Sequence, residues 1–554
     1  MLLGIDVGGT FTDAVIIDGG TIVSSAKRRT TKENLMNGIT DALGAVMRGA
    51  DPAQIEQVTL STTVVTNTIV EHKEQPVDLY VVAGPGRNVD DIFPVRPVYL
   101  KGYTDHRGIV VERTDVEGIH QLANMVQAKS GTDLAAVSAK FGVRNPKEEI
   151  DVAQALADTY HTISTGSALS GSLNFPRRTI SAYFNSAVAS VFKEFKNAVY
   201  HALDTFHITA PVYILKADGG SLPIDTVESI PVETVFTGPA ATVLGLEALR
   251  STKDAHTVAL DIGGTTTDIS LWKQGKPLMT KEGVSIREYP SAVRSFAVTS
   301  VGIGGESAVR YEDGKLMVGP ERIGPSVALG GTIPTLGDAL IVLGNAHYGD
   351  EQKAYDAIAQ IDTTIDASTM AQRIVDEAVR VVQQGIDTVV AKENKRPIYV
   401  VADIVHPDPF VPAQLVIVGG TAASLGPIIG DQLGLPVHIP ADAAVANAIG
   451  AGVANHTMAI TVHVDTKRRT MVVPELGIQD KSSALRSANA VEEVAYRLLC
   501  EAAQEQGLVA AGVIPDVETI SVEDFPVVDG WQSMERIITV KVQLKAGVSG
   551  YVES

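Results

Sequence analysis

The sequence of 554 residues contains a single cysteine, Cys500. An internal disulfide is therefore impossible, and clustered cysteines cannot form a zinc or iron–sulfur site. A chain without disulfides suits a reducing compartment. We therefore expect a cytoplasmic protein.

Basic side chains are the minority among the charged residues. There are 45 Lys and Arg against 65 Asp and Glu, which gives a net charge of -20. Such a surface repels the phosphates of nucleic acids and the headgroups of anionic membranes. Neither nucleic acid nor a membrane is an expected partner.

We expect no signal peptide, and the sequence also has no long uninterrupted apolar run. Asp6 lies inside the first apolar run, and no basic segment precedes it. The uncharged stretches 409–430 and 443–464 are interrupted by Gly, Pro, Asn and His. They are better explained as buried strands and helices than as membrane spans.

Hydrophobic residues are plentiful, at 45% of the chain. A chain of this length and composition can form large buried cores and amounts to the mass of three or four domains. We therefore expect a globular protein.

One short motif occurs twice, once from Leu3 to Asp13 and once from Leu260 to Asp268. In each copy an apolar run leads to an Asp, two glycines and hydroxyl residues follow, and a second Asp comes seven positions after the first. A further apolar run comes next, so each copy is predicted to fold as strand, Gly-rich turn and strand. Two ordinary β-turns rich in Gly and Thr would explain either copy alone, but the recurrence argues against coincidence.

This pattern suits the binding of a nucleoside triphosphate. Glycines let backbone N–H groups approach phosphate oxygens, Thr hydroxyls add uncharged donors, and an Asp at a strand end can hold Mg²⁺ through water. Neither copy has the Lys of a P-loop. A β-type run rather than a helix follows the glycines, which argues against a dinucleotide-binding fingerprint.

The repeated Gly-Gly-Thr hairpins, each preceded by an Asp, resemble those of the actin, hexokinase and heat-shock chaperone ATPase superfamily. The resemblance implies an α/β fold in which two ribonuclease H-like lobes surround a nucleotide cleft.

Other segments resemble a narrower family, the ATP-dependent hydantoinases and 5-oxoprolinases, which includes acetone carboxylase subunits. The first is Thr62-Thr63-Val-Val-Thr66-Asn67, which is similar to the family's N-terminal region. Three more are similar to a hinge helix, a Gly-rich loop and a Gly-Gly-Thr-x-Pro-Thr motif: Thr237-Gly238-Pro239-Ala240-Ala241, Val301 to Ser307 and Gly330 to Ala339.

Two segments depart from the family pattern. Lys216, Ala217 and Asp218 stand where the family has Gln, Ser and Asn, which puts an amide-based substrate contact at this turn in doubt. Residues 324–329 lack the Cys of the family's Pro-Gly-Pro-Ala-Cys-Tyr-Gly run, so the substrate could differ.

Asp6 and Asp261 are the expected Mg²⁺ ligands and catalytic residues, with ATP as the cofactor. Asp13 and Asp268 would orient a hairpin or a catalytic water, or would simply cap the next turn. The other expected ATP contacts are turn glycines and threonines: Gly8, Gly9, Thr10, Thr12, Gly263, Gly264, Thr265, Thr266, Gly304, Gly305, and, against the adenosine, Gly419 and Gly420.

Three domains are expected. Residues 1–175 form the N-terminal lobe with the first hairpin. Residues 176–455 form the second lobe with the hinge segment, the second hairpin and the adenosine turn. Residues 456–554 form a small α/β unit, with strands at 459–464, 519–522 and 536–544 around a helix at 488–506, suited to packing or subunit contact.

The family resemblance implies that ATP phosphorylates the carbonyl oxygen of a cyclic amide, a hydantoin, 5-oxoproline or lactam, and so drives ring opening. The implied partner is a hydantoinase B-like second subunit, and a homodimer is a further option. The sequence shows no Ser-His-Asp order and no His-rich metal site. The alternatives are an acetone carboxylase-like subunit, a small-molecule kinase, and a non-enzymatic ATPase that remodels a partner.

Overall fold

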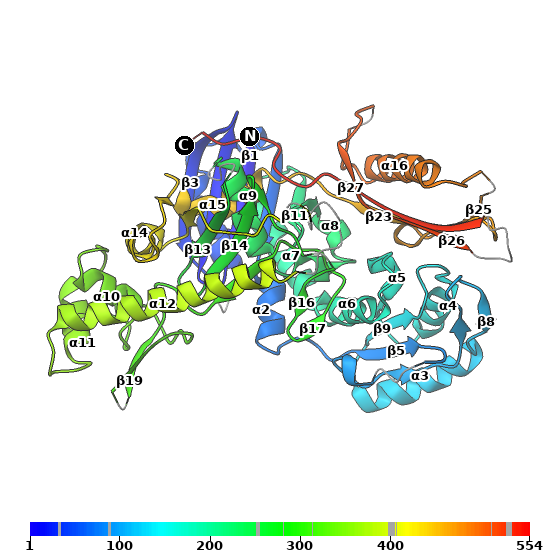
Figure 1. Cartoon of the computed structure of the whole chain (residues 1–554), viewed down its shortest axis with the longest axis horizontal. Helices are drawn as coiled ribbons and strands as arrows, with labels where there is room; N and C mark the ends of the chain where they lie inside the picture. The colour runs from blue at the N-terminus through cyan, green and yellow to red at the C-terminus, as the bar shows by residue number, and fades with distance from the viewer. Residues whose placement is uncertain are drawn as a thin grey trace.

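The structure is a computed structural model of the chain. It describes residues 1–30, 35–86, 90–250, 255–280, 282–312, 314–396, 405, 407–482, 484–510, 512–527 and 535–553. Two sheets lie close together in its centre, while a helical arm and the C-terminal sheet extend to opposite sides (Figure 1). The two ends of the chain meet, because Glu553 forms a β-bridge with Thr21.

The first central sheet has the strand order β12-β11-β4-β1-β2-β3. Strands β1, β2 and β3 are antiparallel neighbours, and β4 and β11 run parallel to β1. The strands are β1 (Leu2–Val7), β2 (Phe11–Asp18), β3 (Thr21–Arg29), β4 (Gln57–Thr62), β11 (Val212–Leu215) and β12 (Ser221–Pro223). Because β11 and β12 come after residue 175, the first lobe uses residues on both sides of that expected boundary.

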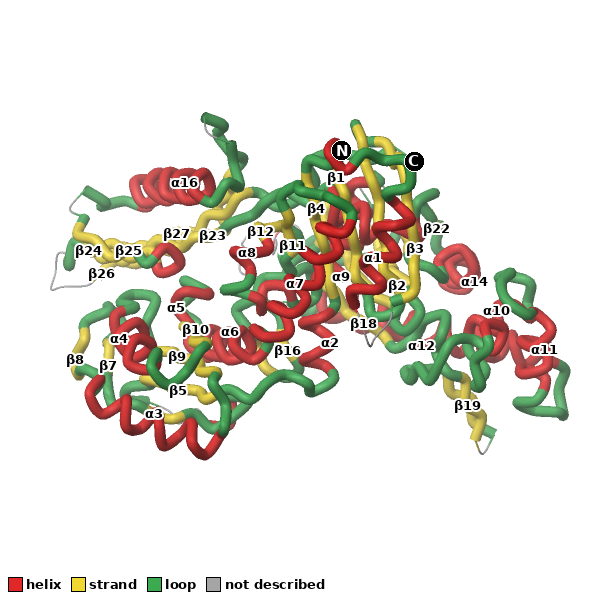
Figure 2. The backbone as a smooth tube through the Cα atoms, turned by 180° about the vertical axis from the view of Figure 1, so that it is seen from behind, coloured by secondary structure: helices red, strands yellow, loops and turns green. Residues whose placement is uncertain are grey.

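Helices cover both faces of this first sheet. Ile16 belongs to the same buried cluster as Ile39 of α1 (Leu35–Val46), whereas its neighbour Val15 packs with Ile449 of α15 (Ala446–Gly452). Successive strand residues point to opposite faces, so the sheet lies between the two helices. Figure 2 shows α1 in front of these strands, next to α7 (Ala189–Thr205).

A smaller parallel sheet, of order β10-β9-β5-β6, is inserted into the first lobe. Its strands are β5 (Asp78–Val82), β6 (Val98–Tyr99), β9 (Leu134–Ala139) and β10 (Thr162–Thr165). Around it lie β7 (Tyr103–Thr104), β8 (Val110–Glu112), α3 (Val116–Ser130), α4 (Lys147–Leu156), α5 (Gly166–Leu169) and α6 (Phe175–Ala187). The short helices α2 (Val64–Val70) and α8 (Ile224–Val227) complete the lobe.

The second central sheet repeats the topology of the first, with the order β15-β14-β13-β21-β22 and β18 beside β14. Its strands are β13 (Thr257–Ile262), β14 (Thr267–Lys273), β15 (Lys276–Pro277), β18 (Val298–Val301), β21 (Gln414–Val418) and β22 (Val437–His438). Asp261 pairs with Asp268 across β13 and β14, as Asp6 pairs with Asp13 across β1 and β2. The predicted pair of ribonuclease H-like lobes is confirmed.

Helices α9 (Thr237–Ala248) and α15 join the two lobes. Residues of α9 pack against the second sheet, α15 packs against the first, and the helices touch each other. Glycines allow this contact. A Cβ on Gly450 would lie 2.0 Å from the Ala241 carbonyl oxygen, and one on Gly245 would lie 2.1 Å from that of Ala446. The glycines of α9 and α15 therefore let the two backbones touch.

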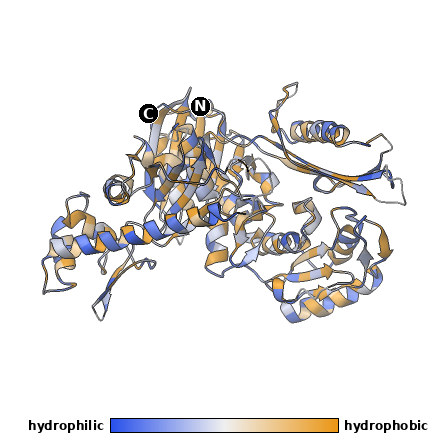
Figure 3. Ribbon diagram, viewed as in Figure 1, coloured by the Kyte–Doolittle hydropathy of each residue, from blue (hydrophilic) through white to orange (hydrophobic). Residues whose placement is uncertain are grey.

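The second lobe carries an extended helical arm. Its helices are α10 (Leu336–Val342), α11 (Glu351–Ala359) and α12 (Ala367–Asn394), with α14 (Ala422–Leu433) beside the sheet. Apolar residues recur at helical spacing along α12, which carries both hydrophobic and hydrophilic residues (Figure 3). The hairpin of β19 (Val309–Glu312) and β20 (Lys315–Val318) completes the lobe, whereas the hairpin of β16 (Ser285–Ile286) and β17 (Tyr289–Pro290) packs against α6 of the first lobe. None of the described helices has both the length and the hydrophobicity that a membrane crossing requires.

The C-terminal unit is an antiparallel sheet of order β25-β24-β23-β27-β26 with one long helix. The elements are β23 (Ala459–Asp465), β24 (Thr470–Val473), β25 (Ile478–Lys481), α16 (Ala488–Glu505), β26 (Val517–Val527) and β27 (Glu535–Leu544). Asp465 forms a two-armed ion pair with Arg107 of the first lobe, at 2.6 to 2.9 Å. This unit is thus docked on the inserted part of the first lobe.

Candidate functional site

One cleft lies between the two hairpins. It has a volume of about 850 Å³ and is lined by both lobes, including the β1–β2 turn, α2, the β13–β14 turn and the turn after β21. Small-molecule sites in proteins typically measure roughly 300–1,000 Å³. The cleft is therefore large enough for a nucleotide together with a small second molecule.

Most of the predicted site residues line this cleft. They are Asp6, Gly8, Gly9, Thr10, Asp13, Asp261, Gly263, Gly264, Thr265, Thr266, Asp268, Gly305, Gly419 and Gly420. The structure brings neither Thr12 nor Gly304 to the cleft surface. Thr12 points to the other face of β2, where its hydroxyl lies 3.0 Å from that of Thr30. Gly304 packs behind the second hairpin, where a Cβ would lie 2.5 Å from the Thr265 nitrogen.

In the first lobe, the register of β1 and β2 places two carboxylates side by side. Asp6 is only 6% exposed and accepts a 2.5 Å hydrogen bond from the Ser61 hydroxyl. Burial, with the neighbouring charge of Asp13, raises the pKa of Asp6 to about 7. Burial also raises the pKa of Asp13, although Lys27 donates to its Oδ2 at 2.5 Å. The Oδ1 of Asp13 is buried without a partner among the described residues.

The second lobe repeats this pair with Asp261 and Asp268. The Thr242 hydroxyl donates to Oδ2 of Asp261 at 2.6 Å, and Ser300 donates to Asp268. Burial and the charge of Asp261 raise the pKa of Asp268 to about 6. Each hairpin thus presents one carboxylate at a strand end and a second beside it, and burial raises the pKa of the second carboxylate in both lobes.

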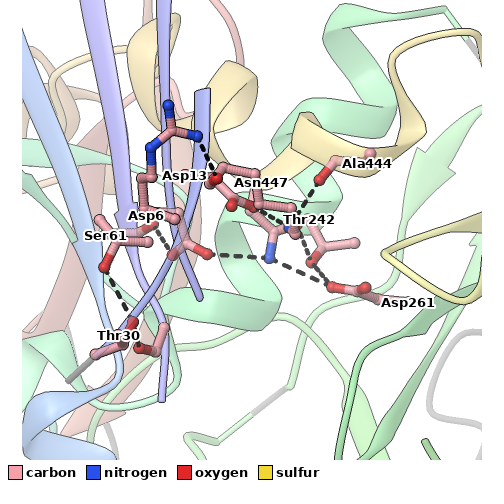
Figure 4. A network of polar contacts seen from close by, with 12 residues as sticks. Asp6, Asp13, Thr30, Ser61, Thr242, Asp261, Ala444 and Asn447 are labelled. Atoms are coloured by element: carbon pink, nitrogen blue, oxygen red, sulfur yellow. Dashed lines mark hydrogen bonds and ion pairs between the residues drawn. The ribbon is translucent and has the colours of Figure 1, made fainter. Parts of the chain in front are cut away.

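Asn447 of α15 connects the two pairs. Its Nδ2 donates to Asp6 and to Asp261, at 3.4 Å in each case, and its Oδ1 accepts from Thr242 at 2.8 Å. Figure 4 shows the amide lying between the two carboxylates. The sequence analysis did not single out this residue. The available signal was one amide side chain in a helix otherwise made of Ala, Gly and Ile.

Glycine is required where the cleft floor meets a carboxylate. Gly419 has φ +97°, and a Cβ there would lie 2.5 Å from Oδ1 of Asp261. Any larger residue would therefore displace Asp261. Gly420 next to it faces open space, as expected for a turn that receives a flat ligand.

The sequence analysis also missed the charged residues of the cleft. Lys27 lies opposite Asp13 in the register of β2 and β3, and its Nζ also donates to the Ala444 carbonyl at 3.0 Å. Arg29, Arg322 and Glu306 form an ion-pair group at the cleft wall. Counting from the Gly19-Gly20 turn would place Ala26 opposite Asp13, and a register shift between Ile16 and Ile17 brings Lys27 there instead. The other three come together only through tertiary folding.

The turn at residues 216–218, which departs from the family pattern, lies outside the cleft. Lys216 and Asp218 are both buried and pair with each other at 3.2 Å, and the cleft lining does not include them. This turn therefore contributes a buried ion pair rather than a cleft contact.

Profiles of one family match most of the chain. The hydantoinase/oxoprolinase N-terminal region matches residues 2–160, and the hydantoinase/oxoprolinase profile matches residues 178–460. The chain belongs to the hydantoinase/oxoprolinase family. The family resemblance predicted from the motifs is confirmed.

Within the hydantoinase/oxoprolinase family, the chain is similar to enzymes of two kinds. It is 26% identical to caprolactamase subunit alpha of Pseudomonas jessenii over 62% of this chain and 54% of that protein. It is 25% identical to the acetophenone carboxylase gamma subunit of Aromatoleum aromaticum over 86% of this chain and 70% of that one. The match thus spans about half the length of the caprolactamase subunit. Both relatives are named as subunits.

Two solved structures of this family share the fold. A nucleotide-free acetone carboxylase superposes with a TM-score of 0.72 and 16% identity, covering 99% of this chain and 87% of that one. The ATP-dependent caprolactamase from Pseudomonas jessenii superposes with a TM-score of 0.70 and 20% sequence identity, covering 98% of this chain and 87% of that one. At these identities the likeness establishes the fold alone.

Proposed function

We propose that this chain is the ATP-using subunit of an enzyme that phosphorylates the carbonyl oxygen of a cyclic amide, such as a hydantoin, 5-oxoproline or a lactam. The observation that carries the proposal is the meeting of Asp6 and Asp261 on the Asn447 amide, at equivalent positions of two Gly-Gly-Thr hairpins. Membership of the hydantoinase/oxoprolinase family supports it, as does the likeness to a caprolactamase described as ATP-dependent.

The hairpins supply donors for the phosphates of ATP. Backbone N–H groups of the turn glycines and the hydroxyls of Thr10, Thr265 and Thr266 would bind phosphate oxygens, and the Gly419-Gly420 turn would lie against the adenosine. Phosphoryl transfer depends on alignment and charge neutralisation more than on covalent participation by the protein. A cleft lined by such donors on both sides would align the phosphates.

The donor set also fits Mg²⁺. Asp6 and Asp261, which both line the cleft, offer the oxygen ligands that this ion prefers. When bound, Mg²⁺ neutralises phosphate charge. No group of three or more His, Cys, Asp or Glu side chains within the described ranges could hold a metal ion alone. Phosphate oxygens and water would therefore complete the ligand set.

The proposed reaction balances as follows. The terminal phosphoryl group leaves ATP and bonds to the carbonyl oxygen, which activates the carbonyl carbon toward water. Water adds to that carbon, the ring C–N bond breaks and the nitrogen takes a proton, which leaves an acyl phosphate. A second water then adds to the acyl carbon, and the phosphate leaves with the original carbonyl oxygen. One cyclic amide, one ATP and two waters give one ring-opened carboxylic acid, one ADP and one phosphate.

The acceptor would lie along α2. Thr63, Asn67 and Thr68 line this side of the cleft, and the Asn67 amide is close enough to the first hairpin that a Cβ on Gly9 would lie 3.3 Å from its Nδ2. The described cleft lining has no His or Cys to activate water. We therefore assign ring opening to a hydantoinase B-like second subunit, in keeping with relatives that are named as subunits.

ADP release from Mg-ATP over a panel of hydantoins, lactams and 5-oxoproline, with and without a candidate second subunit, tests this function. Stimulation by one cyclic amide, with ring-opened product appearing alongside ADP, is the expected result. Asp6→Ala and Asp261→Ala should each abolish the stimulated release. Flat release across the panel, or full activity in either variant, would refute the proposal.

A carboxylase subunit is the second candidate, favoured by the match to acetophenone carboxylase over 86% of this chain. The same cleft would then phosphorylate a ketone enolate oxygen, and the activated carbon would be carboxylated. ADP release that requires acetone or acetophenone together with bicarbonate would support this candidate over the first.

A further inference from the structure

The basic side chains of the cleft are not equally engaged. Four of them line it within the described residues: Lys27, Arg29, Lys73 and Arg322. Lys27 pairs with Asp13 at 2.5 Å, and Lys73 pairs with Glu71 at 2.6 Å. Arg29 and Arg322 instead share a single carboxylate, that of Glu306. This three-residue group, here called the cleft ion group, carries one positive charge more than its carboxylate offsets.

The backbone fixes Glu306 beside the second phosphate hairpin. The N–H of Gly305 donates to the Gly263 carbonyl at 3.0 Å, and that of Glu306 donates to the Gly264 carbonyl at 2.6 Å. A Cβ placed on Gly264 would lie 3.4 Å from Oε2 of Glu306 and 3.6 Å from Cγ2 of Thr10. The carboxylate therefore lies where the tips of the two hairpins approach each other.

The two arginines reach this carboxylate from different lobes. Arg322, which follows β20 in the second lobe, donates Nε–H to Oε2 of Glu306 at 2.6 Å. No residue in the described part of the chain accepts from its two Nη groups. Arg29 comes from β3 of the first lobe, where its side chain is half-exposed and its Nη2 lies 3.7 Å from Oε1 of Glu306. The cleft ion group thus spans the cleft, with N–H donors to spare on both sides.

We propose that Arg322 and Arg29 bind the terminal phosphate of a nucleoside triphosphate, and that Glu306 is a positioning residue that holds both guanidinium groups over the hairpins. This inference rests on the proposed function. The hairpin donors are glycine N–H groups and Thr hydroxyls, which carry no formal charge, whereas a transferring phosphoryl group is stabilised by cations. A guanidinium held through Nε keeps two Nη donors in the fork geometry that matches phosphate.

The arrangement has a consequence for nucleotide selectivity. A diphosphate would satisfy the hairpins but would not reach both arginines, while a triphosphate would join Arg29 of one lobe to Arg322 of the other. The cleft should therefore prefer triphosphate to diphosphate, and that preference should depend on the cleft ion group.

A purely structural ion pair between the lobes would behave differently. Removing that ion pair would lower the thermal stability of the chain and would lower the affinity for both nucleotides by the same factor. If Glu306 instead blocked the phosphate position by repulsion, its neutralisation would tighten triphosphate binding. Comparing the two nucleotides separates these accounts from the positioning role.

The test is calorimetric titration of the full chain with Mg-ADP and with the Mg complex of the non-hydrolysable β,γ-imido analogue of ATP. Arg322→Gln should lower the affinity for the analogue by about tenfold or more while leaving ADP affinity unchanged, because a charge-assisted contact is lost. Arg29→Gln should lower the affinity for the analogue by about threefold, since the present contact of Arg29 with Glu306 is long and its side chain is half-exposed. Glu306→Gln should also lower analogue affinity, and Arg322→Lys should restore part of the loss.

Arg310→Gln is the matched control. Arg310 forms an exposed ion pair with Glu321 on the same lobe, outside the cleft lining, so both affinities should match those of the wild type. Equal weakening of ADP and analogue in Arg322→Gln, or tighter analogue binding in Glu306→Gln, would overturn the inference alone. A wild-type chain that binds ADP without preferring the triphosphate analogue would do the same. Binding of neither nucleotide would overturn the proposed function as well.

Discussion

Asn447 is the side chain on which the two halves of the site meet. The change Asn447→Asp preserves its size, removes the N–H donor shared by Asp6 and Asp261, and adds a third carboxylate beside them. Because the raised pKa of Asp6 already reflects repulsion and burial, further negative charge should disorganise the pair.

We expect Asn447→Asp to lower ATP turnover by at least about tenfold, which corresponds to roughly 1.4 kcal/mol or more of lost stabilisation. ADP release from Mg-ATP measures it. Asn124→Asp on the exposed surface of α3 makes the same chemical change away from the cleft. This variant should turn over ATP at the wild-type rate. Equal turnover in Asn447→Asp and the wild type would contradict the bridging role.

His463 provides a pH-dependent contact between the C-terminal unit and the first lobe. It is 5% exposed, its Nε2–H donates to the Gly171 carbonyl at 2.7 Å, and its Nδ1 accepts from the Thr539 hydroxyl at 3.1 Å. Burial lowers the pKa of His463 to about 4, and the charges of Arg144 and Arg178 act in the same direction.

Since the folded-state pKa of His463 lies below the unfolded value of about 6.5, its neutral form stabilises the fold above that pH. This contribution is lost as the pH falls toward 4, and it amounts to at most about 3 kcal/mol. His463→Gln, which can still donate to Gly171, should therefore show a smaller fall in thermal midpoint between pH 7 and pH 4.5. An identical fall in both proteins would count against this assignment.

At the level of residues, the sequence predicted positions whose neighbours are local. Asp6, Gly8 and Thr10 follow one another in a single turn, so their convergence could be predicted from spacing. The predicted role of Thr12 did not allow for strand alternation, which turns it away from the cleft. Asn447 was not predicted, because it reaches Asp6 and Asp261 only after segments far apart in the sequence have packed together. Glu306 follows the predicted Gly305, but its pairing with Arg29 and Arg322 depends on the tertiary fold.

At the level of elements, the contact between α9 and α15 sets the distance between the lobes. The change Gly450→Ala would place a methyl group 2.0 Å from the Ala241 carbonyl oxygen and 2.5 Å from the Gly245 nitrogen. The helices must then separate, and overpacking of this kind typically costs roughly 1–3 kcal/mol.

Because α9 carries Thr242 and α15 carries Asn447, Gly450→Ala should lower both the thermal midpoint and nucleotide affinity. Gly550→Ala is the control, since a Cβ there meets nothing within 4 Å. Differential scanning calorimetry with and without nucleotide measures both effects. A Gly450→Ala protein as stable as the control would show that the helices do not pack as described.

The secondary structure of the lobes was predictable because its signals are periodic. Alternating or continuous apolar runs gave the hairpin strands, and helical spacing gave α12. The contribution of β11 and β12 to the first sheet was not predictable in this way, because parallel pairing with β4 depends on the intervening insertion and not on local pattern.

On the scale of the whole molecule, the fold brings two copies of one hairpin to opposite walls of a single cleft. No described residue of the inserted sheet or of the C-terminal unit lines that cleft, whereas Tyr348, between α10 and α11 of the helical arm, does. We propose that this cleft transfers phosphate to the carbonyl oxygen of a cyclic amide.

The most direct measurement of that claim follows the carbonyl oxygen itself. The cyclic amide that stimulates ADP release is prepared with ¹⁸O in its carbonyl group and turned over with Mg-ATP and the second subunit. The account predicts that the label appears in inorganic phosphate, one ¹⁸O for each ADP released. Label retained in the carboxylate of the product, with phosphate oxygen taken from water, would contradict it.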